Sequence, residues 1–207
     1  MKRCVIVGGA GINDYDRVRG YLREDDYFIY CDCGLRHADG LGFPPDLIVG
    51  DFDSYTAERP DAETIILPCE KDDTDTVYAV KEALKRGFED FLIIGGVGAR
   101  LDHSLGNVSI LSMLHGLDKK ALLVDDYSEM EVVSREPVYI DESFPYFSLL
   151  AVFGTAEGVY IENAKYPLEN AVITCDYQYG ISNEVPKGKI ACVRVENGSL
   201  LLIRVKE

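Results

Sequence analysis

The chain has 207 residues, of which 47% are hydrophobic and 28% are charged. This composition is typical of a folded globular protein, and the length suits one large domain or two small ones. The formal net charge of -15 argues against binding to nucleic acid, because that association depends on Lys and Arg side chains. No apolar segment has the length of a signal-peptide core or a membrane span, so we expect a cytoplasmic protein that binds no membrane.

Apolar strand-like runs and helix-like segments alternate over the first 126 residues. The segments with helical periodicity are 15–24, 73–86 and 101–115. The strand candidates are the runs CVIVGG, YFIYCDC, DLIVGD, TIILP, FLIIGG and ALLVDD. This alternation predicts a Rossmann-like α/β domain, in which a mostly parallel sheet is flanked by helices and ligands bind at the carboxyl ends of the strands.

The pattern changes after residue 126 to short β-prone runs separated by glycine, proline and asparagine. Helical periodicity is nearly absent from this part, which predicts a small antiparallel β-sandwich or barrel. The pair Asn197-Gly198 lies between two apolar runs and predicts a type I′ hairpin turn, because both residues tolerate positive φ. We therefore expect two domains, 1–126 and 127–207.

Acidic residues follow three predicted strands of the first domain. Asp32 follows FIYC, Asp51 and Asp53 follow LIVG, and Asp75 comes after IILPCEK. In an extended segment Asp51 and Asp53 point the same way, with their carboxylates about 5–6 Å apart. At an effective dielectric constant near 20 their repulsion costs roughly 3 kcal/mol, which a bound cation would offset. Because the ligands are oxygens and no histidine is near, the cluster favours Mg²⁺ over Zn²⁺.

Helix and turn capping is the competing interpretation of these aspartates. Asp72 and Asp73 stand next to the start of the predicted helix 73–86 and suit a capping role. For Asp51 and Asp53 we favour metal binding, because one cap does not need two carboxylates.

The segment GGVGARLDHSLGN, residues 95–107, follows the strand FLII and opens the helix 101–115. Its glycines allow the backbone to approach a ligand closely, and the helix N-terminus offers unpaired N–H groups to an anion. Arg100 provides a donor fork suited to phosphate. Asp102 and His103 at the same turn can orient a nucleophile or bind ribose. The apolar residues that we expect to point inward are Leu101, Leu105, Val108 and Leu111.

Other motifs carry less information. GGAGIND, residues 8–14, lacks the third glycine of the dinucleotide fingerprint, and we interpret it as a tight strand-to-helix turn that can touch phosphate. The chain has no Walker lysine after this turn and no GxSxG serine. The six cysteines lack zinc-site spacing, and we expect them to be reduced core residues.

With these residues assembled, the chain resembles bacterial thiamine pyrophosphokinases, which transfer a pyrophosphoryl group from ATP to thiamine. Four motifs match in order: CDCG at 31–34, DLIVGDFDS at 46–54, KDDTD at 71–75 and GARLDHSLGN at 98–107. The likeness extends weakly to KYPLENAVITCDYQYGISNEV at 165–185. The resemblance implies an ATP-binding catalytic domain, a thiamine-binding β-sandwich, Mg²⁺, and a homodimer with active sites between the catalytic domain of one subunit and the sandwich of the other.

The resemblance also implies roles for individual residues. By position, the metal ions would be surrounded by Asp32, Asp51, Asp53 and Asp75. The nucleotide and transfer site would be lined by Lys71, Gly98, Arg100, Asp102, His103 and Asn107. Ser182 and Asn183 would face thiamine. Related enzymes often stack thiamine on a tryptophan, which this chain lacks, so the aromatic face would come from Tyr166, Tyr177 or Tyr179. Cys33 stands where the family usually has glycine.

The implied reaction is attack of the primary hydroxyl of thiamine on the β-phosphorus of ATP, with release of AMP. Asp75 or Asp102 would take the hydroxyl proton, and the sequence does not choose between them. Two enzymatic alternatives are a pyrophosphokinase acting on another alcohol, such as a hydroxymethyl pterin, and a DxD nucleotide-sugar transferase. A non-enzymatic alternative is a nucleotide sensor whose β domain recruits a partner protein.

Overall fold

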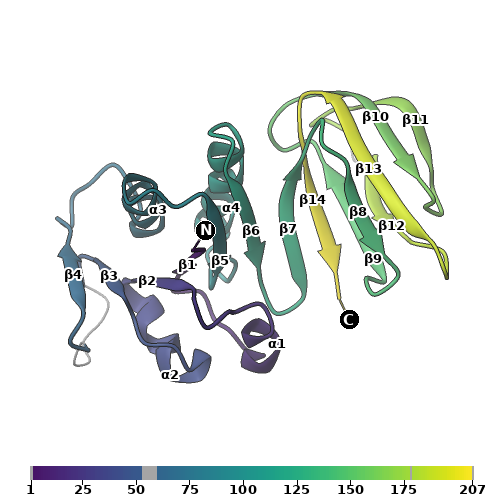
Figure 1. Cartoon of the computed structure of the whole chain (residues 1–207). Coiled ribbons are helices and arrows are strands. Elements are labelled where there is room, and N and C mark those ends of the chain that lie inside the picture. The colour runs from purple at the N-terminus through teal and green to yellow at the C-terminus, as the bar shows by residue number, and fades with distance from the viewer. Residues whose placement is uncertain (1, 53–59, 178, 207) are drawn as a thin grey trace. The chain divides into compact units, whose positions relative to one another are not determined.

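The computed structural model describes residues 2–52, 60–177 and 179–206. The chain divides into two compact units, Met1–Asp126 and Tyr127–Glu207. The first contains helices and a parallel sheet, and the second contains antiparallel strands (Figure 1). The predicted fold class is therefore confirmed.

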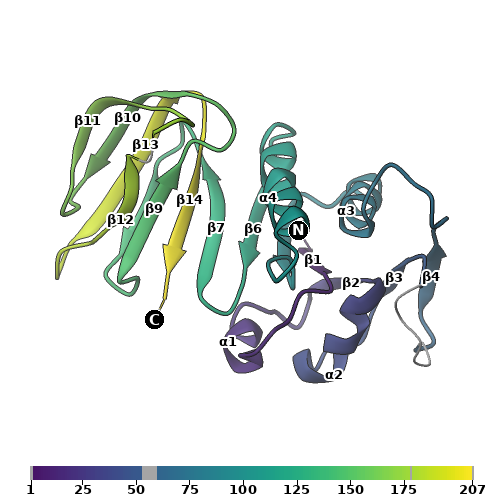
Figure 2. The same cartoon turned by 180° about the vertical axis from the view of Figure 1, so that it is seen from behind.

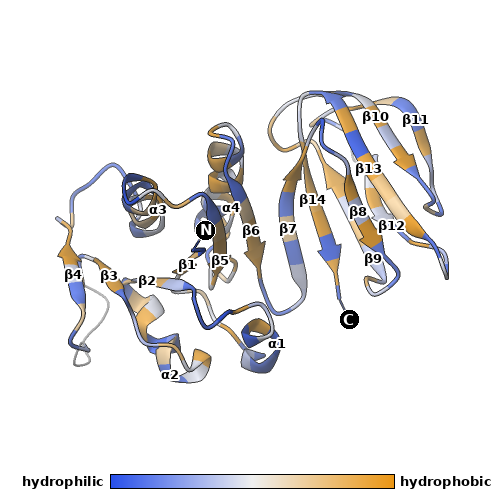
Figure 3. Ribbon diagram, viewed as in Figure 1, coloured by the Kyte–Doolittle hydropathy of each residue, from blue (hydrophilic) through white to orange (hydrophobic). Residues whose placement is uncertain are grey.

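The first unit is built on a parallel sheet with the strand order β6-β5-β1-β2-β3-β4. Its strands are β1 (Cys4–Val7), β2 (Tyr27–Cys31), β3 (Leu47–Gly50), β4 (Glu63–Ile66), β5 (Asp90–Ile94) and β6 (Lys120–Val124). The central strands are buried on both faces, which explains why they are continuous apolar runs rather than alternating ones. Figure 3 shows β5 and β6 as hydrophobic along most of their length.

Helices cover both faces of this sheet. They are α1 (Tyr15–Arg19), the 3₁₀ helix η1 (Asp32–His37), α2 (Ala38–Leu41), α3 (Asp75–Lys85) and α4 (Leu101–His115). Figures 1 and 2 show α1 and α2 on one side of the sheet and α3 and α4 on the other. The chain therefore changes face between the neighbouring strands β1 and β5, and ligands of open α/β sheets bind at such a switch point. Among the described residues, no helix has the length and apolar character to cross a membrane.

Two local predictions for the first unit are wrong, and two short helices were not predicted. The helix predicted over 15–24 ends at Arg19, because Gly20 caps it and the chain continues in 3₁₀-like turns. The sequence pattern did not predict η1 or α2. The N-cap of α3 is Thr74, whose side chain accepts a hydrogen bond from Val77 N, and not Asp72 or Asp73.

The buried face of α4 also differs from the prediction. Leu101 and Leu105 are 67% and 57% exposed, although Leu111 is buried as expected. The residues that face the protein are Ser104, Asn107, Ile110, Leu111 and Leu114. Apolar residues occur all round this helix, so periodicity alone does not identify the inner face. The inner face includes the polar residues Ser104 and Asn107 because the first turns of α4 line a cavity, which is described below.

The second unit is an antiparallel β-sandwich of two four-stranded sheets, ordered β12-β9-β14-β7 and β11-β10-β13-β8. The first sheet contains β7 (Ser128–Val133), β9 (Tyr146–Leu150), β12 (Gly180–Asn183) and β14 (Leu200–Val205). The second contains β8 (Val138–Asp141), β10 (Ala156–Glu162), β11 (Leu168–Ile173) and β13 (Ile190–Asn197). Buried side chains from both sheets, such as Phe147, Val159, Val193 and Leu202, form one hydrophobic core.

The prediction of a β-hairpin at Asn197-Gly198 is wrong, because the two strands that flank this turn do not pair with each other. A turn does occur there, but β13 pairs with β10 and β8, whereas β14 pairs with β7 and β9. The turn therefore connects the two sheets of the sandwich. Gly198 has φ 81°, and positive φ at position 197 is not observed. A Cβ on Gly198 would lie 2.5 Å from the Thr155 carbonyl oxygen, which explains the need for glycine.

Candidate active site

A cavity of about 370 Å³ lies in the first unit, at the carboxyl ends of β1, β2 and β5. Two glycine segments, residues 8–11 and 95–98, form part of its wall. They are joined by hydrogen bonds from Gly8 N to Ile94 O (2.8 Å) and from Ala10 N to Gly95 O (2.9 Å). A Cβ on Gly8 would lie 2.5 Å from the Gly95 carbonyl oxygen, so the two segments approach this closely only because glycine is present.

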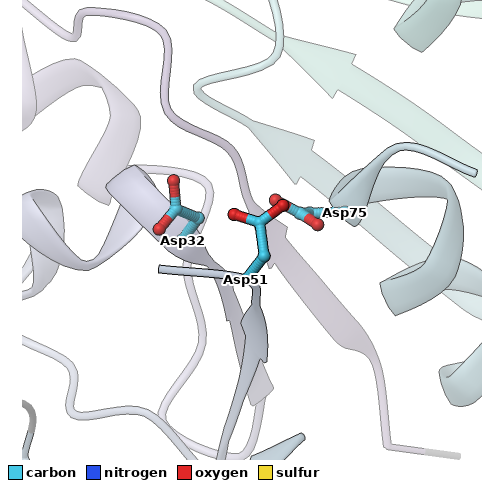
Figure 4. Close-up of side chains that lie close together, drawn as sticks. All are labelled: Asp32, Asp51 and Asp75. Atoms are coloured by element: carbon cyan, nitrogen blue, oxygen red, sulfur yellow. The ribbon is translucent and has the colours of Figure 1, made fainter. Parts of the chain in front are cut away.

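Three of the four aspartates that we predicted as metal ligands lie together beside this cavity. Asp32 begins η1, Asp51 follows β3, and Asp75 is the first residue of α3. One carboxylate oxygen from each lies within 4.8 Å of the others, and Figure 4 shows the three side chains close together. Asp53, the fourth, lies outside the described residues. The parallel topology explains this convergence, because Asp32 and Asp51 follow neighbouring strands.

The backbone around Asp32 is adapted to this arrangement. Asp32 has φ 35°, a left-handed conformation that few residues other than glycine adopt. A Cβ on Gly50 would lie 3.0 Å from the Cβ of Asp32, so glycine at the end of β3 leaves room for this aspartate. Asp32 is only 9% exposed, and within the described chain its Oδ1 atom has no hydrogen-bond partner.

Lys71 neutralises part of the charge of the acidic cluster. Its Nζ lies 2.5 Å from Asp51 Oδ2 and 3.0 Å from Asp75 Oδ1. Burial lowers the pKa of Lys71, but the contacts with the two carboxylates outweigh it and raise the pKa. Burial, together with the charges of Asp51 and Asp32, raises the pKa of Asp75 although Lys71 opposes this.

The acidic cluster fits a hard divalent cation. Three ionised carboxylates and one ammonium group carry two uncompensated negative charges, which is the charge that one divalent cation neutralises. All the donors are oxygens, and the buried Asp32 Oδ1 offers an unused acceptor. Such a donor set is the kind that Mg²⁺ prefers.

The structure brings most of the predicted nucleotide residues to the same cavity. Besides Asp32 and Asp75, the predicted residues that line it are Gly98, Arg100, His103 and Asn107. Asn107 is buried and donates from Nδ2 to the Gly96 carbonyl oxygen at 2.7 Å. Asn107 therefore holds the second glycine segment in place.

Asp102 and Arg100 form a bidentate ion pair at the edge of the site. Arg100 Nε lies 2.9 Å from Asp102 Oδ1, and Nη2 lies 2.6 Å from Oδ2. Both side chains are exposed, and Asp102 does not line the cavity. The hydrogen bonds from Arg100 hold the pKa of Asp102 far below its ordinary value. This makes Asp102 a weak base.

The sequence pattern missed several residues that line the cavity. Ser104 accepts a hydrogen bond from Gly98 N at 3.0 Å and fixes the start of α4. It lies within the GARLDHSLGN motif, but serine in a helix gave no separate signal. Arg36 lies on the unpredicted η1 and also lines the cavity, as do Thr74 and Thr76 around the start of α3.

The second unit contains a separate cavity of about 400 Å³, lined by Tyr166, Tyr179 and Asn183 among others. Asn183 is buried. Its Oδ1 accepts from Tyr166 N (3.0 Å) and Glu184 N (2.9 Å), and its Nδ2 donates to Tyr166 O (2.8 Å). Asn183 thus fixes the wall that presents Tyr166. Ser182 is exposed, with φ 56°, and is not in the lining; Tyr177 lines a smaller cavity of about 90 Å³ with Tyr179.

An open parallel α/β sheet with a glycine-walled cavity at its switch point and clustered carboxylates beside that cavity defines a class of enzymes that bind small molecules at the strand ends. Comparison with known proteins gives the family. The model for the thiamin pyrophosphokinase catalytic domain matches residues 18–123, and the model for the vitamin B1 binding domain of the same family matches residues 134–200. The chain belongs to the thiamine pyrophosphokinase family.

Individual relatives resemble the chain over its whole length. The thiamine pyrophosphokinase of Bacillus subtilis (strain 168) is 29% identical over 212 residues, which cover 99% of each protein. A crystal structure of thiamine pyrophosphokinase from Bacillus subtilis has a TM-score of 0.88, with 27% identity and all of both chains covered. One from Geobacillus thermodenitrificans has a TM-score of 0.84, with 29% identity over 99% of this chain and 98% of that chain.

Proposed function

We propose that this protein transfers the pyrophosphoryl group of ATP to the hydroxyl of thiamine, producing thiamine diphosphate and AMP. The observation that carries the proposal is the convergence of Asp32, Asp51 and Asp75 beside a glycine-walled cavity, in a chain of this family. Family membership favours this reaction over pyrophosphoryl transfer to a pterin alcohol and over glycosyl transfer from a nucleotide sugar. The α/β unit would bind ATP, and the β-sandwich unit would bind thiamine.

The residues of the acidic cluster would hold Mg²⁺, which would neutralise the phosphate oxygens of ATP. Lys71, already in contact with two of the aspartates, would orient their carboxylates. The glycine segments would admit the phosphates, and Arg100 and His103 at the cavity wall would contact the nucleotide.

Thiamine would attack the β-phosphorus with its primary hydroxyl. The O–P bond to the hydroxyl forms as the bond to the α-phosphate oxygen breaks, AMP leaves, and the hydroxyl proton passes to a carboxylate. The ion pair with Arg100 makes Asp102 a poor acceptor, so Asp75 is the better candidate for the base. In the second unit, the cavity wall carrying Tyr166 and Tyr179 would supply the aromatic face for thiamine.

A coupled assay for AMP tests the reaction. With ATP and Mg²⁺ present, AMP should form only when thiamine is added, and chelation of Mg²⁺ should stop it. The substitution Asp51→Asn should lower kcat/KM by about 10²–10³-fold, the range found when one preorganised charge-stabilising group is removed. Asp39→Asn, an equal charge change at an exposed position of α2, is the matched control and should retain the wild-type rate.

Two results would contradict parts of this proposal. Release of AMP with a pterin alcohol but not with thiamine would show that the substrate is wrong. A wild-type rate for Asp51→Asn would show that the acidic cluster does not serve the reaction.

The homodimer and the cytoplasmic location are also proposals. The resemblance to the family supports a dimer, and sedimentation equilibrium should then give twice the 23.0 kDa mass of one chain. The cysteines in the described residues are free thiols, which supports a reducing compartment such as the cytoplasm. Cys69 and Cys175 are exposed, so the expectation that all six are core residues is wrong. Fractionation of cells that express the protein would test the location.

A further inference from the structure

The first glycine segment is held by η1 from behind. Arg36 donates a hydrogen bond to the Gly9 carbonyl oxygen, and His37 Nε2 lies 2.8 Å from the Ala10 carbonyl oxygen. Two consecutive carbonyl groups of the cavity wall are therefore bound by two consecutive side chains. Arg36 and His37 lie outside the four motifs that carry the family resemblance, the first of which ends at Gly34.

The surroundings of His37 determine which nitrogen carries its proton. The side chain is only 3% exposed, and Nδ1 lies 2.7 Å from the Tyr15 hydroxyl. A carbonyl oxygen at 2.8 Å can only accept, so Nε2 must be protonated, and Tyr15 then donates to Nδ1. The longer contact from Arg36 Nε to Nε2, at 3.3 Å, cannot compete with this arrangement. Burial lowers the pKa of His37, which keeps the ring neutral.

The orientation of the Ala10 carbonyl fixes that of the next amide. The peptide group is planar and trans, so the N–H of Gly11 points in the direction opposite to the Ala10 C=O, away from His37. Gly11 lines the cavity and is exposed, and its amide has no hydrogen-bond partner among the residues that the structure describes. A Cβ on Gly11 would meet nothing within 4 Å, so the space beside its Cα is open.

The far end of the same segment is fixed independently. Asp126 accepts hydrogen bonds from Asn13 N at 3.0 Å and from Asp14 N at 3.1 Å, and Arg17 donates to its carbonyl oxygen. Anchored at both ends, the Ala10-Gly11 peptide keeps one orientation, and His37 is the side chain that determines it.

We propose that His37 is a positioning residue that directs the Gly11 N–H into the cavity, where it binds an anionic phosphate oxygen of the nucleotide. This inference rests on the proposed function of the cavity as the ATP site. It goes beyond the acidic cluster, because it gives the protein a neutral, metal-independent contact to the same polyanion.

A matched pair of substitutions at His37 tests the proposal. In His37→Gln the side-chain amide reaches the position of Nε2 and can still donate to the Ala10 carbonyl, whereas in His37→Asn it reaches only the position of Nδ1. His37→Asn should raise KM for ATP about tenfold, the range for one hydrogen bond to a charged group, with kcat within about twofold. His37→Gln should restore most of the loss. Thermal melting of each variant separates this effect from unfolding.

A second pair acts on the amide itself. Gly11→Pro removes the N–H, and Gly11→Ala retains it while adding a Cβ to open space. KM for ATP should be about tenfold higher in Gly11→Pro than in Gly11→Ala. Binding of α,β-methylene-ATP with Mg²⁺, measured by calorimetry on the full chain, should show the same order.

The outcomes separate this proposal from the proposed function. If the wild-type protein forms no AMP from ATP and thiamine, the proposed function fails. If the wild type is active but His37→Asn and Gly11→Pro leave both KM for ATP and α,β-methylene-ATP binding unchanged, the role of His37 is refuted while the enzyme stands. A loss confined to kcat would also refute it, because a binding contact should act on KM.

Discussion

The position of Asp75 in the acidic cluster suits metal binding but destabilises the folded protein when no metal is bound. It lies beside two other carboxylates in a partly buried position, and burial raises its pKa above the ordinary value of 3.8. A carboxyl group with a raised pKa in the folded state binds its proton more tightly there than in the unfolded chain. Its contribution to the free energy of unfolding therefore decreases as the pH rises from its unfolded pKa through its folded pKa.

This sign leads to a prediction for Asp75→Asn. In protein freed of divalent cations at pH 7, the variant should melt at a higher temperature than the wild type, because a destabilising charge is removed. The difference should shrink as the pH falls below the pKa of Asp75, where the wild-type carboxyl is itself protonated. Thermal melts with a chelator at several pH values measure it.

Magnesium should change the order of these two proteins. Added Mg²⁺ should stabilise the wild type through the acidic cluster and should stabilise Asp75→Asn less. A variant that is less stable than the wild type at pH 7 without metal would show that the contact of Asp75 with Lys71 outweighs the repulsion.

Among the helices, α3 positions Asp75, because its N-cap fixes the residue at which the helix begins. Thr74 has an extended backbone, and its side-chain oxygen accepts from Val77 N at 3.3 Å, which ends the loop and makes Asp75 the first helical residue. A carboxylate in this first turn also interacts favourably with the helix dipole. The cap therefore links the stability of α3 to the geometry of the acidic cluster.

Removal of this cap gives the second prediction. Thr74→Ala should lower the free energy of unfolding by about 1 kcal/mol, whereas Thr74→Ser, which keeps an oxygen at the same place, should lower it by less than half of that. Urea denaturation followed by circular dichroism measures both. Equal losses in the two variants would mean that the methyl group, and not the hydrogen bond, stabilises the helix end.

For the whole molecule, the net charge of -15 is the dominant electrostatic fact. Self-repulsion on this scale destabilises the compact state, and at physiological ionic strength salt largely screens the repulsion between exposed charges that are more than about 8–10 Å apart. Repulsion within the acidic cluster also destabilises the folded state, and salt screens it less because the carboxylates are partly buried and only a few ångströms apart.

Salt and Mg²⁺ should consequently act differently on stability. The melting temperature should rise as NaCl increases from about 10 to 150 mM, and MgCl₂ at equal ionic strength should raise it further. The extra rise should be lost in Asp51→Asn. A melting temperature that falls with NaCl, or an equal effect of the two salts, would contradict the respective part of this expectation.

The sequence predicted those elements whose pattern is set by local burial. The apolar runs of the buried strands β1, β2, β3 and β5 and the helix Leu101–His115 were located because continuous or periodic hydrophobicity is a direct consequence of burial on two faces or one. The elements η1 and β12 were missed, because their sequences, DCGLRH and GISN, contain no apolar run.

The candidate site shows the same division. Aspartates at the carboxyl ends of parallel strands lie along one edge of the sheet, so the parallel sheet inferred from the sequence places Asp32 and Asp51 at the same edge. That their strands β2 and β3 are neighbours is a finding of the structure. The pairing of Arg100 with Asp102, the exposure of Leu101 and the place of His37 behind Ala10 required the folded backbone.

By itself, the sequence determined the alternation of strands and helices, the change to antiparallel strands after residue 126, and the strand ends that carry the acidic groups. These follow from hydrophobic period and chain order, which are local properties. The tertiary structure decided which atoms meet: the ammonium of Lys71 with two carboxylates, and the imidazole of His37 with a loop carbonyl. The contacts of Lys71 with Asp51 and of His37 with Ala10 join residues 20 and 27 positions apart, and their geometry depends on the packing of all the elements between them.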